Sequence, residues 1–226
     1  MKNLEKFRSK IDLIDNNILK LLKSRSKLAL EIGKLKKVGK INFNLFRPER
    51  QAKILKRLYL KRDILFNEKD ILSFWREIFF HQTRLQGKLD FIIPSFLNKR
   101  DRRMVFNLFG IDIIINEYNN LEKAFLKTKN NNNSLLILPF PGKTKRSMWW
   151  SNSKLKNLYI TSSVPTLLDL NLNPELVVLS NQMPILEGEN ILYYFSTQEF
   201  LNEELDLVIA IKNKYLYSSK LLVKKK

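Results

Sequence analysis

A seven-residue repeat of apolar side chains runs along the first part of the chain, and a single arginine interrupts it. The repeat places Leu4, Ile11, Ile18 and Ile32 at one position and Phe7, Ile14, Leu21, Leu28 and Leu35 at the other. A stripe of this kind is what a long helix buries against partner helices. Arg25 stands where the next apolar residue is due. The pattern therefore predicts one long helix whose packed face carries a positive charge.

The charge of Arg25 requires a partner if the stripe is buried. A guanidinium cannot lose its proton to escape burial, and an unpaired buried cation costs several kcal/mol. Asp12, Asp15 and Glu31 lie off the stripe. The missing anion is then either a bound ligand or a carboxylate of another helix, unless Arg25 extends its apolar stem and reaches solvent. The residues alone leave these alternatives open.

Length and composition exclude several classes of chemistry. The chain has 226 residues, enough for one large or two small domains with true cores. It has no cysteine and one histidine, His81, so thiol nucleophiles and Cys- or His-based metal sites are not expected. Charges interrupt the first 15 residues, and no apolar run reaches the length of a membrane span. We expect a cytoplasmic protein without metal, cofactor or membrane partner, with His81 at the surface or in packing.

The formal net charge of +19 would suit nucleic acid or an anionic membrane. Most of this charge lies within residues 1–88. Lysine, asparagine and isoleucine are all abundant, which indicates a general compositional bias of the encoding genome. No zinc finger, RNP-type aromatic motif or short recognition helix accompanies the charge. Binding to nucleic acid is therefore not expected.

Helical periodicity extends as far as Gly87. It predicts helices over about residues 4–38, 48–62 and 69–87. Pro48 suits the first turn of the second helix, and Asn67 can cap the third. Gly87 can end the third helix. We therefore expect a helical domain over residues 1–88.

From Leu89 onward, short apolar runs alternate with helical segments. The predicted strands are Leu89–Ile93, Ile111–Ile115, Leu135–Leu138, Leu158–Ile160, Leu176–Leu179, Ile191–Phe195 and Leu207–Ile211, with helices near 98–109, 119–128 and 197–204. This pattern is typical of an α/β domain. The predicted fold class is α + α/β, with a three-helix domain over residues 1–88 and a smaller α/β domain over residues 89–226.

Three further polar positions of the helical half can be placed relative to Arg25. Lys36 lies about 20° around the helix and roughly 16 Å along it, so both side chains can reach one small ligand. Arg8 lies roughly 25 Å away, so it can join that site only from a second, antiparallel subunit. On the third helix, Gln82 and Gln86 extend the apolar face at helical spacing. Buried amides need partners, whereas amides at a fraying helix end can be hydrated.

Three segments carry a resemblance to a known family. They are FRSKIDLIDNNILKLLKSRSKLALEIGKLK at 7–36, RPERQAKIL at 47–55 and WREIFFHQTRLQ at 75–86. Together they strongly resemble the all-helical class of chorismate mutase over nearly all of residues 4–87. The resemblance implies an intertwined homodimer of three helices per chain, with each active site completed by an arginine of the other subunit.

The resemblance also implies roles for individual residues. It assigns catalytic roles to Arg25, Lys36 and Gln86, and substrate binding to Arg8 of the partner subunit, Arg47, Arg50, Gln51 and Gln82. In these roles Arg25 and Arg50 bind carboxylates, and Lys36 and Gln86 donate to the ether oxygen. Two positions depart from the family pattern, because Gln51 replaces a usual glutamate and Gln82 a common serine. The implied reaction is the rearrangement of chorismate to prephenate, which needs no metal or cofactor.

The second half resembles a shortened prephenate dehydratase domain, which follows a mutase domain in bifunctional relatives. The Thr-Arg-Phe triplet of that family is missing, and the nearest stretch reads Asn173-Pro174-Glu175-Leu176. We therefore expect a degenerate domain that does not dehydrate prephenate and has no assigned role. Binding an aromatic amino acid and stabilising the dimer are two possibilities. Trp149 and Trp150 are candidates for a lid or for the core.

Two other functions compete with the mutase. An enzyme of the same helical fold acting as an isochorismate pyruvate lyase would bind its isomeric dianion with the same arginines. A catalytically silent protein, either a regulatory partner or a nucleic-acid binder, is the third possibility.

Overall fold

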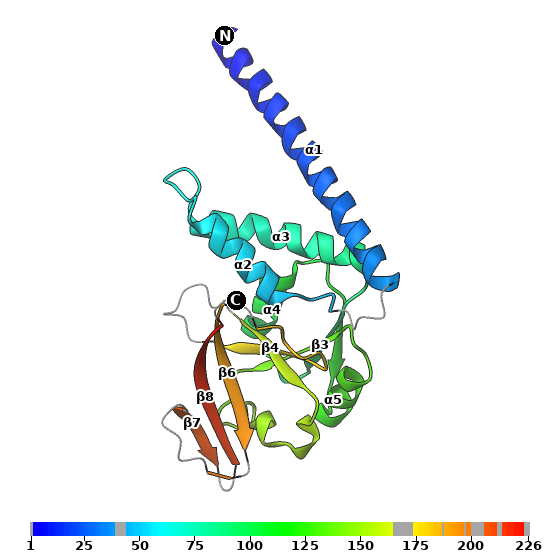
Figure 1. The fold of residues 1–226 in the computed structure, drawn as a ribbon, viewed down its shortest axis with the longest axis vertical. Coiled ribbons are helices and arrows are strands. Elements are labelled where there is room, and N and C mark those ends of the chain that lie inside the picture. The colour runs from blue at the N-terminus through cyan, green and yellow to red at the C-terminus, as the bar shows by residue number, and fades with distance from the viewer. Residues whose placement is uncertain are drawn as a thin grey trace.

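The computed structural model describes residues 2–38, 44–164, 174–186, 188–196, 198–199, 206–211 and 214–223. The helical region consists of α1 (Lys2–Val38), α2 (Pro48–Tyr59) and α3 (Glu68–Gln86). In Figure 1, α2 and α3 lie against the sheet-containing region, whereas most of α1 projects away from the rest of the molecule. Only the C-terminal third of α1 contributes buried residues, Ala29 and Gly33.

Local signals set the ends of α2 and α3 as the sequence predicted. Pro48 occupies the first turn of α2. Asn67 accepts hydrogen bonds from the backbone of Lys69 and Asp70, and the Asp70 side chain accepts one from the Asn67 backbone, which completes a capping box. Gly87 is the C-cap of α3. Strand β1 (Asp90–Pro94) begins three residues beyond Gly87, so the change from helices to α/β occurs where the sequence placed it.

The C-terminal region is built on a five-stranded mixed sheet with the order β2-β1-β3-β5-β4. Its strands are β1, β2 (Ile115–Tyr118), β3 (Ser134–Pro139), β4 (Tyr159–Val164) and β5 (Leu176–Ser180). Strands β1, β2 and β3 are parallel, and β5 runs antiparallel between β3 and β4. Helix α4 (Lys99–Phe109) covers one face and α5 (Leu121–Lys129) the other, so alternate residues of β3 enter two separate cores.

A second, three-stranded antiparallel sheet has the order β6-β8-β7. Its strands are β6 (Gly188–Ser196), β7 (Asp206–Ile211) and β8 (Lys214–Val223). It packs on the α5 side of the larger sheet, where the Phe195 ring lies 6.2 Å from Trp150 and 6.1 Å from Trp149. Two short 3₁₀ helices, Met148–Ser151 and Ser153–Leu155, carry this contact. Trp149 and Trp150 are buried, so they are core residues and not a lid.

Some predicted elements were misplaced. The strand predicted over Ile111–Ile115 is wrong, because β2 begins at Ile115 and Gly110, with φ of +92°, leads into a turn. Ile111 and Ile114 are 83% and 71% exposed, so this apolar run does not enter the core. Strand β8 was not predicted, and α2 ends three residues before the predicted limit. The helix predicted over 197–204 lies outside the described residues apart from Gln198 and Glu199, which are not helical.

Candidate functional site

The site predicted from the sequence centres on the crossing of α1 and α3. Ala29 and Gly33 are the buried residues of α1 at this crossing, and Ser26 is half-buried one turn earlier. A Cβ at Gly33 would lie 3.3 Å from Cα and 3.3 Å from Cγ of Gln86. Small residues at spacings of three and four therefore let α3 approach α1 closely. This approach determines where Gln86 lies.

Arg25 is half-buried beside this crossing, and its guanidinium carbon lies 5.7 Å from the centre of the Phe79 ring. This distance suits a cation–π contact. Burial lowers the pKa of Arg25 below its ordinary value, and the positive charge of Arg50 lowers this pKa further. Among the described side chains, no ion pair involves Arg25 or Arg50. Arg50 is exposed in the first turn of α2, close enough for its charge to act on Arg25.

The two glutamines predicted for the site lie on the same side of α3. Gln82 is buried, and its Nε2 donates to Oγ of Ser26 over 3.3 Å. Gln86 is half-buried, and its Nε2 donates to the backbone oxygen of Gln82 over 3.3 Å. Both amides have protein partners, and neither adds charge. Ser26, Gln82 and Gln86 thus form a small polar cluster at the helix crossing next to Arg25.

Arg47 differs from the other predicted substrate-binding arginines. Its Nε donates to Oε1 of Glu49, whose side chain is nearly buried. A carboxylate of the same chain therefore already neutralises Arg47, whereas no described side chain forms an ion pair with Arg25 or Arg50. Gln51 is half-buried in the first turn of α2, and its backbone amide donates to the Arg47 carbonyl over 3.1 Å.

Of the remaining residues from the sequence analysis, Arg8 and His81 are not part of this cluster, and the position of the Lys36 side chain is not described. Arg8 is exposed on the projecting part of α1, and its 17-residue separation from Arg25 along the helix corresponds to roughly 25 Å. The backbone of Lys36 belongs to the last turn of α1, but its side chain lies outside the described part of the structure. His81 is exposed on α3, as expected.

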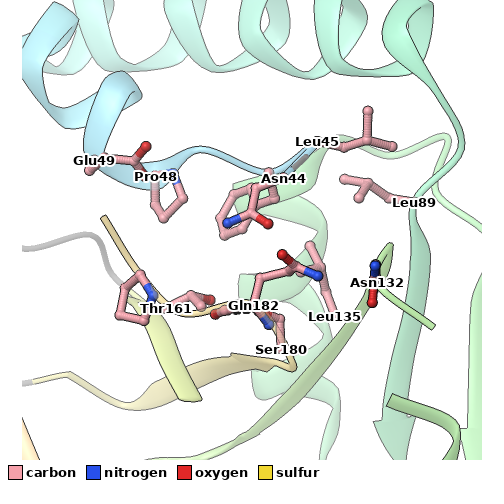
Figure 2. Close-up of a pocket in the computed structure, with 12 residues that line it drawn as sticks. Asn44, Leu45, Pro48, Glu49, Leu89, Asn132, Leu135, Thr161, Ser180 and Gln182 are labelled. Atoms are coloured by element: carbon pink, nitrogen blue, oxygen red, sulfur yellow. Dashed lines mark hydrogen bonds between the residues drawn. The ribbon is translucent and has the colours of Figure 1, made fainter. Parts of the chain in front are cut away.

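A separate cavity lies between the start of α2 and the end of the larger sheet (Figure 2). Asn44, Pro48 and Glu49 line one side, and Thr161, Ser180 and Gln182 line the other. Its volume of about 10 Å³ is comparable to that of one water probe, far below the several hundred Å³ of small-molecule sites. None of the arginines predicted to bind substrate lines it. This cavity marks the contact between the two regions and not a substrate site.

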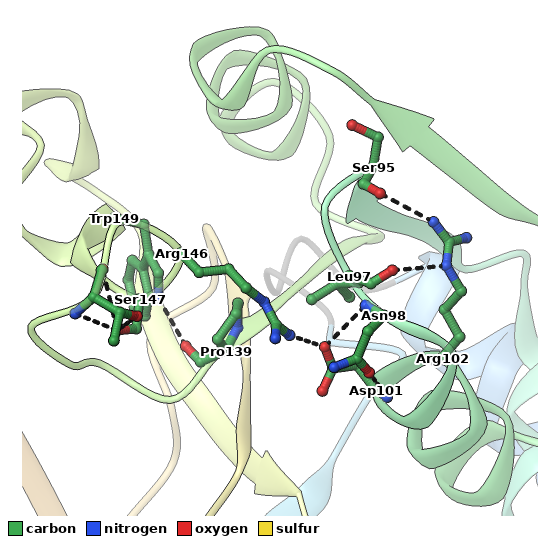
Figure 3. A network of polar contacts seen from close by, with 10 residues as sticks. Ser95, Leu97, Asn98, Asp101, Arg102, Pro139, Arg146, Ser147 and Trp149 are labelled. Carbon is green, nitrogen blue, oxygen red and sulfur yellow. Dashed lines mark hydrogen bonds and ion pairs between the residues drawn. The ribbon is translucent and has the colours of Figure 1, made fainter.

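A polar network in the C-terminal region has a structural explanation (Figure 3). Asn98 and Asp101 form the capping box of α4, and Arg146 pairs with Oδ2 of Asp101. This ion pair ties the loop after β3 to the start of α4. Arg102 donates to the backbone oxygens of Leu97 and Ser95, and both ends of its guanidinium contact Glu117. These arginines are already paired within the chain.

Comparison with known proteins identifies the helical region. Residues 7–87 match the family chorismate mutase type II. The chain is also 34% identical, over 93 residues, to the bifunctional chorismate mutase/prephenate dehydratase of Aquifex aeolicus (strain VF5). This match covers 39% of the chain and 25% of the relative, so the chain spans only about a quarter of that protein. No solved structure matches the chain.

These findings confirm the predicted resemblance to chorismate mutase, and the name of the relative joins a mutase with a prephenate dehydratase. They also fit a helical mutase domain followed by a sheet-containing domain. Along the described residues, no group of three or more His, Asp and Glu side chains forms a potential metal site. None of the described helices is both long enough and apolar enough to cross a membrane.

Sequence reasoning missed the residues that shape the cluster around Arg25. Ser26, Ala29 and Gly33 form the close contact with α3, and Phe79 lies under the arginine. A signal was present in the sequence, because small residues recur along α1 at spacings of three and four. Phe79 lies on the apolar face of α3 that Gln82 and Gln86 extend, but its contact with Arg25 depends on the crossing of two helices.

Proposed function

We propose that this protein is a chorismate mutase, which rearranges chorismate to prephenate in the biosynthesis of phenylalanine and tyrosine. The observation that carries the proposal is the half-buried Arg25 at the α1–α3 crossing that also holds Gln82 and Gln86, where the charge of Arg50 acts on it and no described side chain forms an ion pair with either arginine. Two unpaired cations held together cost free energy that a dianion would recover. The match of residues 7–87 to chorismate mutase type II supports a dianion of this kind.

The proposed mechanism asks the protein to position the substrate and stabilise charge. Arg25, Arg50 and Arg8 of the partner subunit bind the two carboxylates and hold the reactive conformer. As the ether C–O bond breaks, negative charge grows on its oxygen, and Lys36 and Gln86 donate to it. Gln51 can accept a hydrogen bond from the substrate hydroxyl but lacks the charge of a glutamate, so ground-state affinity is weakened. The rearrangement is intramolecular and needs no general base, metal or cofactor.

We also propose a homodimer, because α1 exposes its predicted packing face. Phe7 and Leu21 are 62% and 70% exposed, and the same stripe continues through Ile11, Ile14, Ile18 and Leu28. A second apolar surface, formed by Leu60, Ile64, Leu65 and Phe74, lies at and beside the α2–α3 turn. Exposed apolar surfaces of this extent mark interaction sites, and a two-fold axis can cover both with a second copy. Ile14→Lys should give monomers by sedimentation, whereas Ile111→Lys should not.

The organisation of the remaining chain is part of the proposal. We assign residues 1–88 to the mutase domain and residues 89–226 to a degenerate dehydratase-like domain that does not dehydrate prephenate. Support comes from the start of β1 at Asp90 and from the missing Thr-Arg-Phe triplet. We place the protein in the cytoplasm as a biosynthetic enzyme.

The decisive experiment incubates the purified full chain separately with chorismate and with isochorismate. Prephenate is measured after acid conversion to phenylpyruvate, and released pyruvate is measured with lactate dehydrogenase. We expect prephenate from chorismate. Pyruvate from isochorismate, without prephenate from chorismate, would establish the lyase instead. If neither substrate is consumed, the chain is a catalytically silent protein and the mutase proposal is wrong.

A further inference from the structure

Helix α3, which carries Phe79, and the segment that leads into α2, which carries Arg50, both contact the C-terminal domain. Phe46 immediately precedes Arg47 at the start of α2, yet its side chain belongs to the core on the α4 face of the larger sheet. It is 9% exposed, and its ring centre lies 5.4 Å from that of Phe109 on α4. The segment leading to Arg50 is therefore anchored in the second domain.

A chain of aromatic contacts continues from this anchor to α3. Phe109 lies 4.8 Å from Phe91 on β1, and Phe91 lies 6.4 Å from Phe80 on α3, measured between ring centres. Distances of this size are typical of favourable aromatic pairs. Phe80 is the neighbour of Phe79, whose ring lies under Arg25. The second domain thus contacts both structural supports of the Arg25–Arg50 couple.

Local contacts in the first turn of α2 include Pro48 and the ion pair of Arg47 with the nearly buried Glu49. The N-cap of α2 is Arg47, which makes no side-chain capping hydrogen bond, although Ser, Thr, Asp or Asn at this position commonly contributes about 1 kcal/mol. Leu55, near the other end, is the only residue that is fully buried within α2. The burial of Phe46 therefore adds an anchor in the second domain, directly before Arg47 and four residues before Arg50.

Helix α3 and its C-cap also make close contacts. A Cβ at Gly110 would lie 2.9 Å from the Phe80 ring, and a Cβ at Gly87 would lie 2.8 Å from Leu45 in the segment before Phe46. Arg76 of α3 donates to the backbone oxygen of Asn107 at the end of α4. The contacts of Phe80 with Gly110 and of Arg76 with Asn107 join α3 to the second domain, whereas the contact of Gly87 with Leu45 lies within the helical domain and holds the segment before Phe46 against the end of α3.

We propose that the C-terminal domain is a positioning element of the chorismate site and that Phe46 transmits this effect to Arg50. The inference rests on the mutase function proposed above and gives the second domain a role that requires no catalysis of its own. Phe46 touches no substrate in this scheme. It is a positioning residue, because its ring fixes the start of α2 relative to α3.

Kinetics on three variants of the full chain test the proposal. Phe46→Ala removes the anchor, Phe46→Leu keeps most of its volume, and Phe125→Ala removes a ring of the same size from the opposite core, where it is 1% exposed. At a temperature where all three are folded, we expect Phe46→Ala to raise KM for chorismate about tenfold or more and to change kcat less, since Arg50 grips ground and transition states alike. Phe46→Leu should recover most of this loss, and Phe125→Ala should leave KM unchanged. If KM rises equally in Phe46→Ala and Phe125→Ala, general destabilisation explains the increase and the proposal is wrong.

Hydrogen exchange on the same proteins gives a readout that needs no substrate. Without Phe46, amides of the first turns of α2 should exchange at least about tenfold faster, whereas Phe125→Ala should leave them unchanged. If the wild-type chain forms no prephenate, faster exchange in Phe46→Ala still supports positioning of α2, so the two proposals fail separately. Unchanged protection of α2 in Phe46→Ala would overturn the positioning role whatever the kinetics show. If Phe46→Ala does not fold, the same KM and hydrogen-exchange measurements are compared between Phe46→Leu and Phe125→Ala. We then expect the same direction of change in Phe46→Leu, with a smaller difference from Phe125→Ala.

Discussion

The two domains differ in how far their apolar side chains are buried. In the C-terminal domain, β3 and β5 are buried along their whole length, and helices or a second sheet cover both faces. In the helical domain, α1 exposes the stripe on which its seven-residue repeat stands. The C-terminal domain completes its core within one chain. The helical domain has a long helix, α1, whose apolar stripe is not covered by the described residues of the same chain.

The arginines of the two domains also differ in whether they have partners within the chain. Arg100, Arg102 and Arg146 of the C-terminal domain pair with Glu175, Glu117 and Asp101. Arg25 and Arg50 of the helical domain lie near each other, and burial and mutual repulsion both lower the pKa of Arg25. Paired arginines serve the fold of their own domain. That no described side chain forms an ion pair with Arg25 or Arg50 supports the proposal that these arginines bind a ligand.

The largest expected effect comes from removing one cation of each kind. Arg25→Ala should lower kcat/KM for chorismate about a hundredfold or more, because a charge-assisted contact in the transition state is worth roughly 2–4 kcal/mol. Arg102→Ala should leave kcat/KM within about twofold, because the ion pair with Glu117 and the hydrogen bonds to Leu97 and Ser95 that it loses all lie within the C-terminal domain. Steady-state kinetics and thermal unfolding of both variants check this.

The stability of these variants sharpens the comparison. A base whose pKa is lowered by folding destabilises the native state at every pH below that lowered pKa. Arg25→Ala should therefore be no less stable than the wild type in the absence of ligand. Full activity in Arg25→Ala would remove the mutase mechanism described here.

Subunit mixing gives the next largest effect. Arg8→Ala and Arg25→Ala should each be inactive alone, but a heterodimer holds one site with both arginines and one with neither. After joint refolding, random pairing should restore about a quarter of wild-type activity. The assay is prephenate formation, with heterodimers verified through a tag on one chain. Verified heterodimers that remain as inactive as their parents would contradict a site shared between subunits.

A smaller effect is expected at the crossing of α1 and α3. Gly33→Ala places a methyl group 3.3 Å from Cα and Cγ of Gln86, so α3 must yield by a few tenths of an ångström. We expect kcat to fall about tenfold with little change in KM, since Gln86 acts on charge that develops in the transition state. Alanine favours the helix over glycine by about 1 kcal/mol, so lost stability cannot explain the loss of activity. Ser24→Ala, on an exposed face of α1, is the control, and an unchanged kcat in Gly33→Ala would argue against this role of Gln86.

The smallest effect concerns pH. Gln51 and Gln86 have nothing to titrate, and the arginines stay charged even though burial and Arg50 lower the pKa of Arg25. A bound dianion would raise the pKa of both Arg25 and Lys36. We expect kcat to change less than about threefold between about pH 5 and 9. A bell-shaped profile centred near pH 6 to 7 would instead point to His81 or to an unrecognised carboxylate.

The sequence predicted those parts of the structure that depend on neighbouring residues. Asn67, Pro48 and Gly87 mark helix ends through local geometry, and Arg25 stood out because the repeat around it is regular. The run from Ile111 to Ile115 failed because an apolar run at a sheet edge can lie in a turn as well as in a strand.

The environment of the site was harder to predict for a related reason. Gln82 was correctly placed on the packed face of α3, but its partner Ser26 follows only from the angle at which two helices cross. Phe46 carries no local signal at all. It is one of several apolar residues in a segment between helices, and its partners on β1 and α4 come much later in the chain. Contacts between domains are set by shape, which a periodic pattern does not contain.

The anchoring of Phe46 also determines when the helical domain can mature. Phe91 and Phe109 leave the ribosome only after α1, α2 and α3 have all been made. Contacts between residues so far apart in sequence form late, because the loop between them must close first. The start of α2 thus acquires its final register only once the parallel strands have assembled around β1. A nascent chain that ends at Gly87 would hold three helices with the arginines present and the aromatic wall for Phe46 not yet synthesised.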